Sequence, residues 1–130
     1  MDSIAKKLKV VDAIAGAVGL TNITTEHIRV EELKSRKFDF VISRAVAPLK
    51  DLWKWSKPLI RSKKNRAEST ELNVMDESGA PFNFPGLICL KGGDLAKEIQ
   101  ESNTRPRMIG IKTLFDETFF EDKFILYVTR

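Results

Sequence analysis

The sequence FDFVISRAVAPL, residues 38–49, sets the fold class because it joins a strand pattern to charged and turn-forming residues. Residues 38–42 form an aromatic and β-branched run, which is typical of a strand covered on both faces in an α/β sheet. Arg44 follows at the carboxyl end of this run, where open α/β sheets bind their ligands, so it is a candidate to meet an anionic or planar ligand. A salt bridge from Arg44 to a neighbouring helix is the alternative, and the position of the residue leaves both open.

The composition indicates one domain with a substantial core. The chain has 130 residues, of which 42% are hydrophobic, and 22 Lys and Arg against 18 Asp and Glu give a net charge of +4, which allows a polyanionic partner without requiring one. The only cysteine, Cys89, lies in an apolar run at 87–90, so we expect a buried hydrophobe in a reducing compartment. No apolar run approaches the length of about 18 residues that a membrane helix needs, and the first residues lack the core of a signal peptide. We therefore expect a soluble, cytoplasmic protein.

Apolar residues at intervals of three and four predict a first helix over residues 4–18. Asp2 or Ser3 can cap its free amides, and Gly19 supplies the left-handed residue that commonly ends a helix. Three lysines fall off the apolar stripe and form either a solvated side or a surface for phosphates: Lys6, Lys7 and Lys9.

The remaining segments predict a mixture of strands and helices. In chain order they are a strand over 22–30, a turn or short helix at 31–33, a helix from Pro48 that ends near Pro58, a strand over 87–90, a helix over 95–100, and a hairpin of strands 108–114 and 124–128. Residues 61–84 lack a sustained period and predict a long loop or ragged hairpin. At least one of Trp53 and Trp55 is expected to pack against the protein rather than stack on a base, because the two face different ways on a helix.

Few residues suit covalent or metal chemistry. His27 is the only histidine and Cys89 the only cysteine, which argues against a zinc site, a Cys–His pair and a Ser–His–acid triad. Gly92 and Gly93 before a helix allow an anion site, although a plain turn with Asp94 as the helix cap is the better interpretation. A group transfer in which the cosubstrate carries the reactive centre fits this residue set better than a reaction with a protein nucleophile.

Four segments, in this order along the chain, resemble the successive motifs of the RsmG (GidB) family: DSIAKK at 2–7, RVEEL at 29–33, FDFVISRAVAPL at 38–49 and LKGGDL at 90–95. The SRAVAPL part, at 43–49, is the most specific of them. Members of this family are S-adenosylmethionine-dependent methyltransferases that modify N7 of a guanine in small-subunit (16S) ribosomal RNA. The resemblance implies a Rossmann-like class I methyltransferase fold, with a mostly parallel sheet and an antiparallel C-terminal hairpin, in one domain over residues 1–130.

The resemblance also assigns cofactor contacts to individual residues. Asp2, with Ser3 beside it, matches the acidic residue that reaches the ribose hydroxyls of the cofactor. Val30 and Glu31 match the pair beside the adenine, where the family more often has alanine in place of Val30. Arg44 matches an arginine at the cofactor site. The residues that are candidates for RNA phosphates are Lys6, Lys7 and Lys91.

The implied reaction requires no covalent bond between the protein and its substrates. Guanine N7 is itself the nucleophile, so the protein's task is to place the methyl sulfonium in line with it, and neither a general base nor a metal is implied. The implied partner is small-subunit ribosomal RNA, and we expect a monomer that acts away from membranes.

One part of the family pattern has no counterpart in this chain. The first strand and its glycine-rich turn, which hold the methionine end of the cofactor, would lie before Asp2, whereas the chain begins at Met1. We therefore expect the N-terminal strand or strands of the fold to be missing and S-adenosylmethionine binding to be weak or absent. Two alternatives stay open: a non-catalytic RNA-binding remnant of such an enzyme, and another nucleotide-binding α/β enzyme, which would need its own phosphate loop.

Overall fold

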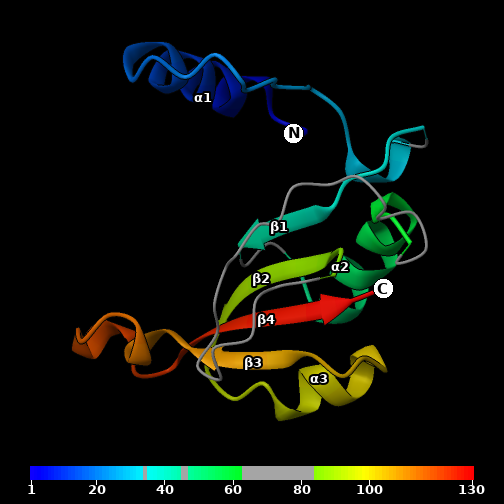
Figure 1. Ribbon diagram of the computed structural model, residues 1–130, viewed down its shortest axis with the longest axis vertical. Helices are drawn as coiled ribbons and strands as arrows, with labels where there is room; N and C mark the ends of the chain where they lie inside the picture. Colours follow the sequence, from blue (N-terminus) through cyan, green and yellow to red (C-terminus); the bar gives the residue numbers. More distant parts are fainter. Residues whose placement is uncertain (34, 45–46, 63–83) are drawn as a thin grey trace. The chain divides into compact units, whose positions relative to one another are not determined.

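The computed structural model describes residues 1–33, 35–44, 47–62 and 84–130, and the chain divides into two compact units, residues 1–36 and 37–130. The elements of both units are labelled in Figure 1. The loop or hairpin predicted over 61–84 lies outside the described residues except for its ends. The organisation of residues 1–130 as a single domain stays a prediction.

The first unit is built on α1 (Ala5–Ala17), which confirms the helix predicted over 4–18. Gly19 follows the helix with a positive φ of 72°, a conformation that favours glycine because it has no Cβ. The predicted side-chain cap is wrong. Ile4 occupies the capping position without a side-chain hydrogen bond, and the carboxylate of Asp2 instead accepts the backbone N–H of Ile4 at 2.8 Å.

The strand predicted over 22–30 is also wrong. That segment forms an isolated parallel bridge between Asp2 and His27, with a backbone hydrogen bond from the N–H of Asp2 to the carbonyl of Glu26 (3.3 Å). A strand needs a neighbour along its length to pair its backbone groups, and within the described part of residues 1–36 this bridge is the only such pairing. The chain then enters the 3₁₀ helix η1 (Val30–Glu32), which confirms the turn or short helix predicted there.

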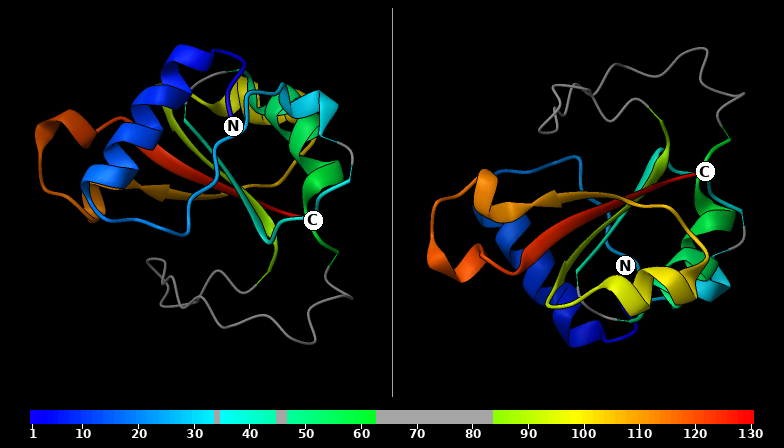
Figure 2. Two further views of the ribbon diagram at one scale, coloured as in Figure 1. Left: turned by 90° about the horizontal axis from the view of Figure 1, so that it is seen from above. Right: turned by 90° about the horizontal axis from the view of Figure 1, so that it is seen from below.

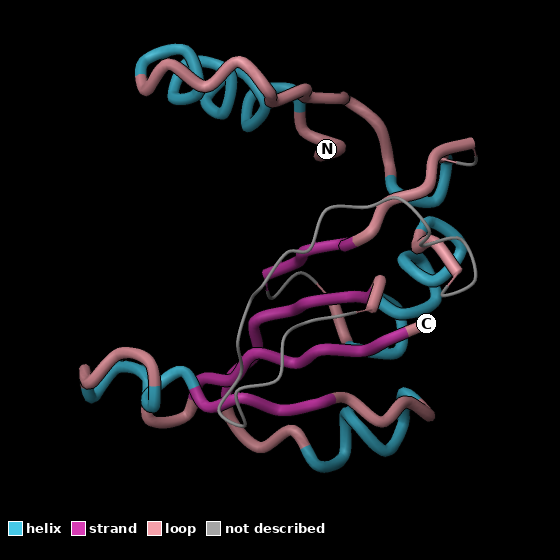
Figure 3. Tube along the Cα trace, in the orientation of Figure 1, coloured by secondary structure: helices cyan, strands magenta, loops and turns pink. Residues whose placement is uncertain are grey.

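The second unit contains a four-stranded sheet (Figure 3). Its strands are β1 (Phe40–Arg44), β2 (Gly86–Gly92), β3 (Arg107–Gly110) and β4 (Lys123–Thr129), in the order β1-β2-β4-β3. β1 and β2 are parallel, whereas β4 is antiparallel to both β2 and β3. The α/β class and the antiparallel C-terminal hairpin are therefore confirmed. The expectation of a mostly parallel sheet fits only loosely, because the hairpin places β4 beside β2 with its direction reversed.

The first strand of the C-terminal hairpin is shorter than predicted. Residues 111–114 were expected to extend it but form the 3₁₀ helix η4 (Ile111–Thr113). The N–H groups of Leu114 and Phe115 both donate to the carbonyl of Ile111, at 2.9 and 3.0 Å. The chain thus satisfies locally the backbone groups that a strand would have paired with a neighbour.

Two short helices cover one face of the sheet, as Figure 2 shows. They are α2 (Leu49–Ser56), which continues into the 3₁₀ helix η2 (Lys57–Leu59), and α3 (Ala96–Ser102). Pro48 immediately precedes α2 and Pro58 lies in η2, which agrees with the predicted start and end of this helix.

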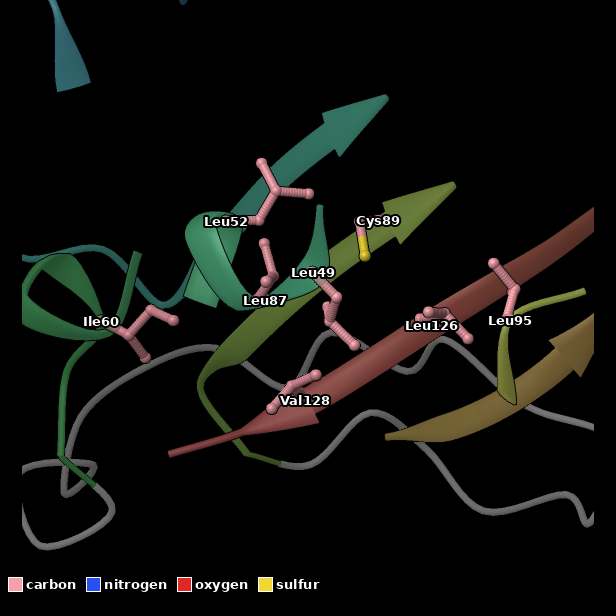
Figure 4. Close-up of a cluster of buried hydrophobic side chains, with 8 residues drawn as sticks. All are labelled: Leu49, Leu52, Ile60, Leu87, Cys89, Leu95, Leu126 and Val128. Atoms are coloured by element: carbon pink, nitrogen blue, oxygen red, sulfur yellow. The ribbon is translucent and has the colours of Figure 1, made fainter. Parts of the chain in front are cut away.

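The main hydrophobic core lies between these helices and the sheet (Figure 4). Alternate residues of β2 and β4 supply the sheet side of this core, because side chains two residues apart in a strand share one face. Trp53 and Trp55 both pack against this cluster, which confirms the expectation that at least one of them does. The buried members are Leu49, Leu52, Ile60, Leu87, Cys89, Leu95, Leu126 and Val128.

The opposite face of the sheet is less completely covered. A small cluster of Ile109 and Tyr127 is buried there, with Ile88 packed against it. Ile42 of β1 is 71% exposed, whereas Leu87 of the adjacent β2 is fully buried. The prediction that residues 38–42 are covered on both faces is therefore wrong at Ile42, because β1 is an edge strand among the described strands.

Candidate functional site

Arg44 is the last residue of β1 and lies opposite Leu90 of the parallel strand β2. Its side chain is exposed, and among the described residues of 37–130 its guanidinium has no hydrogen-bond or ion-pair partner. The alternative of a salt bridge to a neighbouring helix is therefore not found there. An ion pair between an arginine and an aspartate does form at the opposite end of β1, where Nη1 of Arg61 lies 2.9 Å from Oδ2 of Asp39. Within these residues, no partner would have to be displaced for the planar cation of Arg44 to bind a ligand.

A largely buried ion pair lies at the same end of the sheet as Arg44. Nζ of Lys91 lies 2.7 Å from Oε1 of Glu98, and the two side chains are 9% and 25% exposed. Nζ of Lys91 also donates to the carbonyl of Ala47 at 2.5 Å, and Oε1 of Glu98 accepts the backbone N–H of Leu49 at 2.6 Å. We call this ion pair with its two backbone bonds the Lys91–Glu98 clamp. It fixes the entry to α2, a few residues after Arg44.

The clamp bears on the predicted role of Lys91 as an RNA contact. The ammonium of Lys91 has two partners within the protein, so a phosphate could reach it only if the clamp opened. Direct contact of Lys91 with RNA stays a prediction, and the geometry indicates that the residue positions the β1–α2 connection. Sequence reasoning missed Glu98. The available signal was Lys91 itself, because a lysine at the end of a buried strand requires a partner.

The Gly92–Gly93 pair forms the turn between β2 and α3. Gly93 has a positive φ of 80°, and its N–H donates to the carbonyl of Asp122 at 2.9 Å. Oδ1 of Asp94 accepts the N–H of Ala96 at 3.0 Å, at the start of α3. These contacts support the plain turn with Asp94 at the helix start, because the amide of Gly93 is already engaged within the protein.

In the first unit, the predicted cofactor residue Asp2 lies where the chain enters α1. Its Oδ1 accepts the N–H of Ile4 at 2.8 Å, and its Oδ2 lies 3.6 Å from Nζ of Lys7. The ring Nε2 of His27 lies 2.9 Å from the carbonyl oxygen of Ser3, so both chain segments of the parallel bridge are joined by a second contact. The carboxylate of Asp2 is half-buried and held in a defined position.

The other predicted residues of this unit lie at the surface. Val30 is half-buried and Glu31 exposed, and both belong to η1, three and four residues after the bridge at His27. Lys6 and Lys7 are exposed on the first turn of α1. The predicted cofactor residues are thus divided between the units, with Asp2, Ser3, Val30 and Glu31 in residues 1–36 and Arg44 in residues 37–130.

Cys89 is a core residue rather than a reactive one. It is fully buried, as expected, and this burial raises the pKa of its thiol to about 11. Within the described residues, no group of three or more His, Cys, Asp or Glu side chains is arranged to hold a metal ion. In the same residues, no helix combines the length and the apolar character needed to cross a bilayer.

A protein-family model matches the N-terminal half of the chain. The model of the family described as rRNA small subunit methyltransferase G (GidB) matches residues 1–67. This range contains the segments at 2–7, 29–33 and 38–49 and therefore all five predicted cofactor residues.

Curated relatives match nearly the whole chain. A protein of Phocaeicola vulgatus named ribosomal RNA small subunit methyltransferase G is 43% identical over 129 residues, which are 99% of this chain and 54% of that protein. Proteins with the same name are 42% identical in Parabacteroides distasonis, over 98% of this chain and 49% of theirs, and 36% identical in Cytophaga hutchinsonii, over 98% and 54%. The chain spans about half the length of the curated relatives it matches.

Proposed function

The chain belongs to the family of rRNA small subunit methyltransferase G, and from this we propose that it acts in the transfer of a methyl group from S-adenosylmethionine to N7 of a guanine in small-subunit ribosomal RNA. The observation that carries the proposal is the family match over residues 1–67, just over half of the 130 residues. We also propose a Rossmann-like class I arrangement for the whole domain. The parallel β1–β2 pair and the helices that cover the adjoining face support it.

Side chains of each unit, taken separately, suit parts of S-adenosylmethionine. A carboxylate accepts hydrogen bonds from two vicinal hydroxyl groups, so Asp2, held by the amide of Ile4 at 2.8 Å, suits a ribose. The half-buried Val30 beside the exposed Glu31 offers an apolar and a polar contact to an adenine. The guanidinium of Arg44 has no partner among the described residues of 37–130 and suits a planar or anionic group of the cofactor or of the RNA.

The chemistry that these residues have to support is placement. S-adenosylmethionine, when bound, supplies a methyl group on a positively charged sulfur. N7 of guanine carries its own lone pair, so no side chain has to remove a proton from the attacking atom. Asp2 in the first unit and Arg44 in the second would bind and orient the cofactor, and the Lys91–Glu98 clamp would hold Ala47 and Leu49 at the entry to α2.

The lysines of α1 support contact with RNA. Lys6 and Lys7 are exposed on the first turn of α1, which begins three residues after Asp2, so phosphates that they bind would lie near the cofactor residue. Nζ of Lys7 forms an ion pair with Oδ2 of Asp2 at 3.6 Å, whereas Lys6 has no ion-pair partner among the described residues of this unit.

Transfer of a labelled methyl group tests the proposal. The chain is incubated with labelled S-adenosylmethionine and small-subunit ribosomal RNA, and the labelled base is identified after digestion. Arg44→Ala is expected to lower the rate at least about tenfold, because a lost charge-assisted contact is worth about 1.5–3 kcal/mol. Arg105→Ala is the matched control, since Arg105 is also an exposed arginine without a partner among the described residues. Label on another base, or no transfer even at a cofactor concentration that saturates the expected weak binding, would contradict the proposal.

We expect cofactor binding by these 130 residues to be weak. The resemblance assigns residues of this chain to the ribose, the adenine and an arginine contact, and it assigns none to the methionine end of the cofactor. Calorimetric titration with S-adenosylmethionine should therefore give a Kd weaker than micromolar. Micromolar binding would contradict this expectation.

A non-catalytic RNA-binding role is the second candidate, and the exposed lysines at the start of α1 favour it. It predicts that RNA binding falls steeply with salt concentration while no methyl group is transferred. Binding that persists without S-adenosylmethionine, together with an inactive transfer assay, would favour this role over catalysis.

A further inference from the structure

The connection between β3 and β4 ends in a group of exposed apolar side chains. We call residues 114–122 the aromatic tip. Leu114, Phe115 and Phe119 are 52%, 56% and 71% exposed, which is unusual for three large apolar residues so close together in a sequence. In Figure 1 this segment, drawn in orange, extends beyond the end of the sheet, away from α2 and α3. The main core therefore does not use these side chains.

The tip has its own internal structure. The ring of Phe120 lies between two others, with ring centroids 5.8 Å from Phe115 and 5.3 Å from Phe119, and the latter pair meets edge to face. The backbone is turned by the 3₁₀ helix η5 (Thr118–Phe120), where the N–H of Phe120 donates to the carbonyl of Glu117 at 3.0 Å. Phe119, the most exposed of these apolar residues, therefore lies in a folded turn.

Carboxylates outnumber ammonium groups around these rings, although Nζ of Lys123 lies 5.5 Å from the centroid of the Phe119 ring. Residues 114–122 contain four acidic residues and no basic residue, whereas the whole chain has a net charge of +4. Lys112 and Lys123, just outside the tip, pair with Asp116 at 3.0 Å and with Asp122 at 2.6 Å. Glu117 and Glu121 have no ion-pair partner among the described residues.

This combination selects the kind of partner. Carboxylates repel the phosphates of RNA and of anionic lipids, so the tip is a poor surface for either. Exposed aromatic rings inside a negative rim suit a basic protein surface with an apolar pocket, because aromatic residues dominate the centre of interfaces and complementary charges steer the encounter. A ribosomal particle carries basic proteins beside its RNA, whose phosphates they must neutralise.

We propose that the aromatic tip docks on a basic protein of the small ribosomal subunit, with Phe119 inserted in an apolar pocket of that protein. The proposal rests on the proposed function, since it takes the particle that carries the RNA substrate as the partner. Lysines elsewhere in the chain would contact the RNA, and the tip would hold the chain on a neighbouring protein.

Binding to two probes tests the proposal. The wild-type chain, Phe119→Ala and the control Val10→Ala, which truncates an exposed apolar residue of α1, are titrated with purified small ribosomal subunits and with the protein-free RNA of the same subunits. Phe119→Ala should bind the subunits at least about tenfold more weakly, the effect typical of a central aromatic anchor, and bind the free RNA like wild type. Val10→Ala should match wild type on both probes. Glu117→Lys should also weaken subunit binding, whereas Glu101→Lys, on α3, should not.

Three results would overturn the proposal. One is equal binding of wild type and Phe119→Ala to the subunits, including no binding by either. Another is an equal loss on subunits and free RNA, which would mean that the tip contacts RNA or that the fold has changed. The third is self-association of the wild-type chain that Phe119→Ala abolishes, which sedimentation would detect and which would assign the surface to a second copy.

Photo-crosslinking identifies the partner class directly. With p-benzoylphenylalanine in place of Phe119, irradiation with subunits should yield a crosslink to protein, whereas crosslinks to RNA alone would overturn the proposal. The methyl-transfer assay separates this proposal from the proposed function. Tip-dependent docking without methyl transfer would contradict the proposed function but support the docking surface. Methyl transfer without tip-dependent docking would support the proposed function but contradict the docking surface.

Discussion

Nζ of Lys91 and Oε1 of Glu98 lie 2.7 Å apart, and each of the two side chains also binds the backbone of the β1–α2 connection. The pair therefore joins the end of β2 to the first turn of α3 and to the residues that enter α2. Coulomb attraction is stronger in such a poorly solvated place than at the surface, but the ammonium also loses water. The largest effect of the pair on the free energy of unfolding is therefore expected when one partner is removed and the other stays buried without it.

Glu98→Ala should lower the free energy of unfolding by about 2 kcal/mol. This is less than the about 3–5 kcal/mol typical for breaking a fully buried pair, because the side chain of Glu98 is 25% exposed. The amide of Leu49 loses its acceptor in the same variant, so its hydrogen exchange should accelerate. Chemical denaturation and amide exchange measure the two effects.

Glu101→Ala is the control for this prediction, since Glu101 pairs with Lys97 at 3.9 Å on the exposed side of α3. It should change the free energy of unfolding by less than about 0.5 kcal/mol. Equal stability of the two variants, or unchanged exchange of the Leu49 amide in Glu98→Ala, would show that the clamp does not hold the connection.

Gly86→Ala should destabilise the sheet by about 1–3 kcal/mol, the range for an overpacked core position. A Cβ at Gly86 would lie 2.6 Å from the carbonyl oxygen of Val128 and 2.7 Å from Cε2 of Tyr127. The first of these atoms belongs to the backbone of the paired strand β4, so it cannot turn away.

Gly16→Ala should have the opposite sign. Gly16 lies in α1, and a Cβ at this position would meet no atom within 4 Å, so alanine adds helix propensity worth about 0.5–1 kcal/mol without a clash. Thermal unfolding of both variants checks the pair. A destabilising Gly16→Ala or a neutral Gly86→Ala would contradict the packing described for these glycines.

Local sequence patterns correctly predicted the elements whose formation depends mainly on their own residues. The helix at α1 forms its hydrogen bonds within one segment, and the central strand β2 is apolar over most of its length because both of its neighbours and the helices cover it. The segments at 22–30 and 111–114 have the composition of strands but lack a paired neighbour over their length among the described residues, and pairing depends on residues far away in the sequence. Exposure of Ile42 has the same origin, since the edge position of β1 is a property of the sheet.

The candidate site divides in the same way. The place of Arg44 at the end of a strand followed from residues 38–44 alone, because it depends on one element. The role of Glu98 could not be predicted, because its bond to the amide of Leu49 joins residues 49 positions apart. Contacts of this kind exist only once α2 and α3 have packed on the same face of the sheet.

Arg44→Ala should leave stability unchanged, within about 0.5 kcal/mol, because its exposed guanidinium makes no hydrogen bond or ion pair among the described residues of 37–130. Arg61→Ala removes the pair with Asp39 at 2.9 Å and should cost about 0.5–1 kcal/mol, as partly exposed pairs do. Denaturant titration of both variants checks this order. A large loss in Arg44→Ala would mean that the residue serves the fold, and its effect on methyl transfer would then say nothing about a ligand.

Stability should fall as the pH rises from about 9 to about 11 because of Cys89. Burial raises the pKa of the folded thiol from the ordinary 9.0 to about 11, so between these values the unfolded chain releases the thiol proton while the folded chain keeps it. The contribution is complete below pH 9 and is lost progressively above it, with a slope of at most about 1.4 kcal/mol per pH unit. Other effects of pH on stability are common to both proteins, so the comparison is with Cys89→Ala, whose stability should fall less steeply. Parallel pH profiles of the two proteins, from denaturant titrations at each pH, would show that the thiol does not titrate in this way.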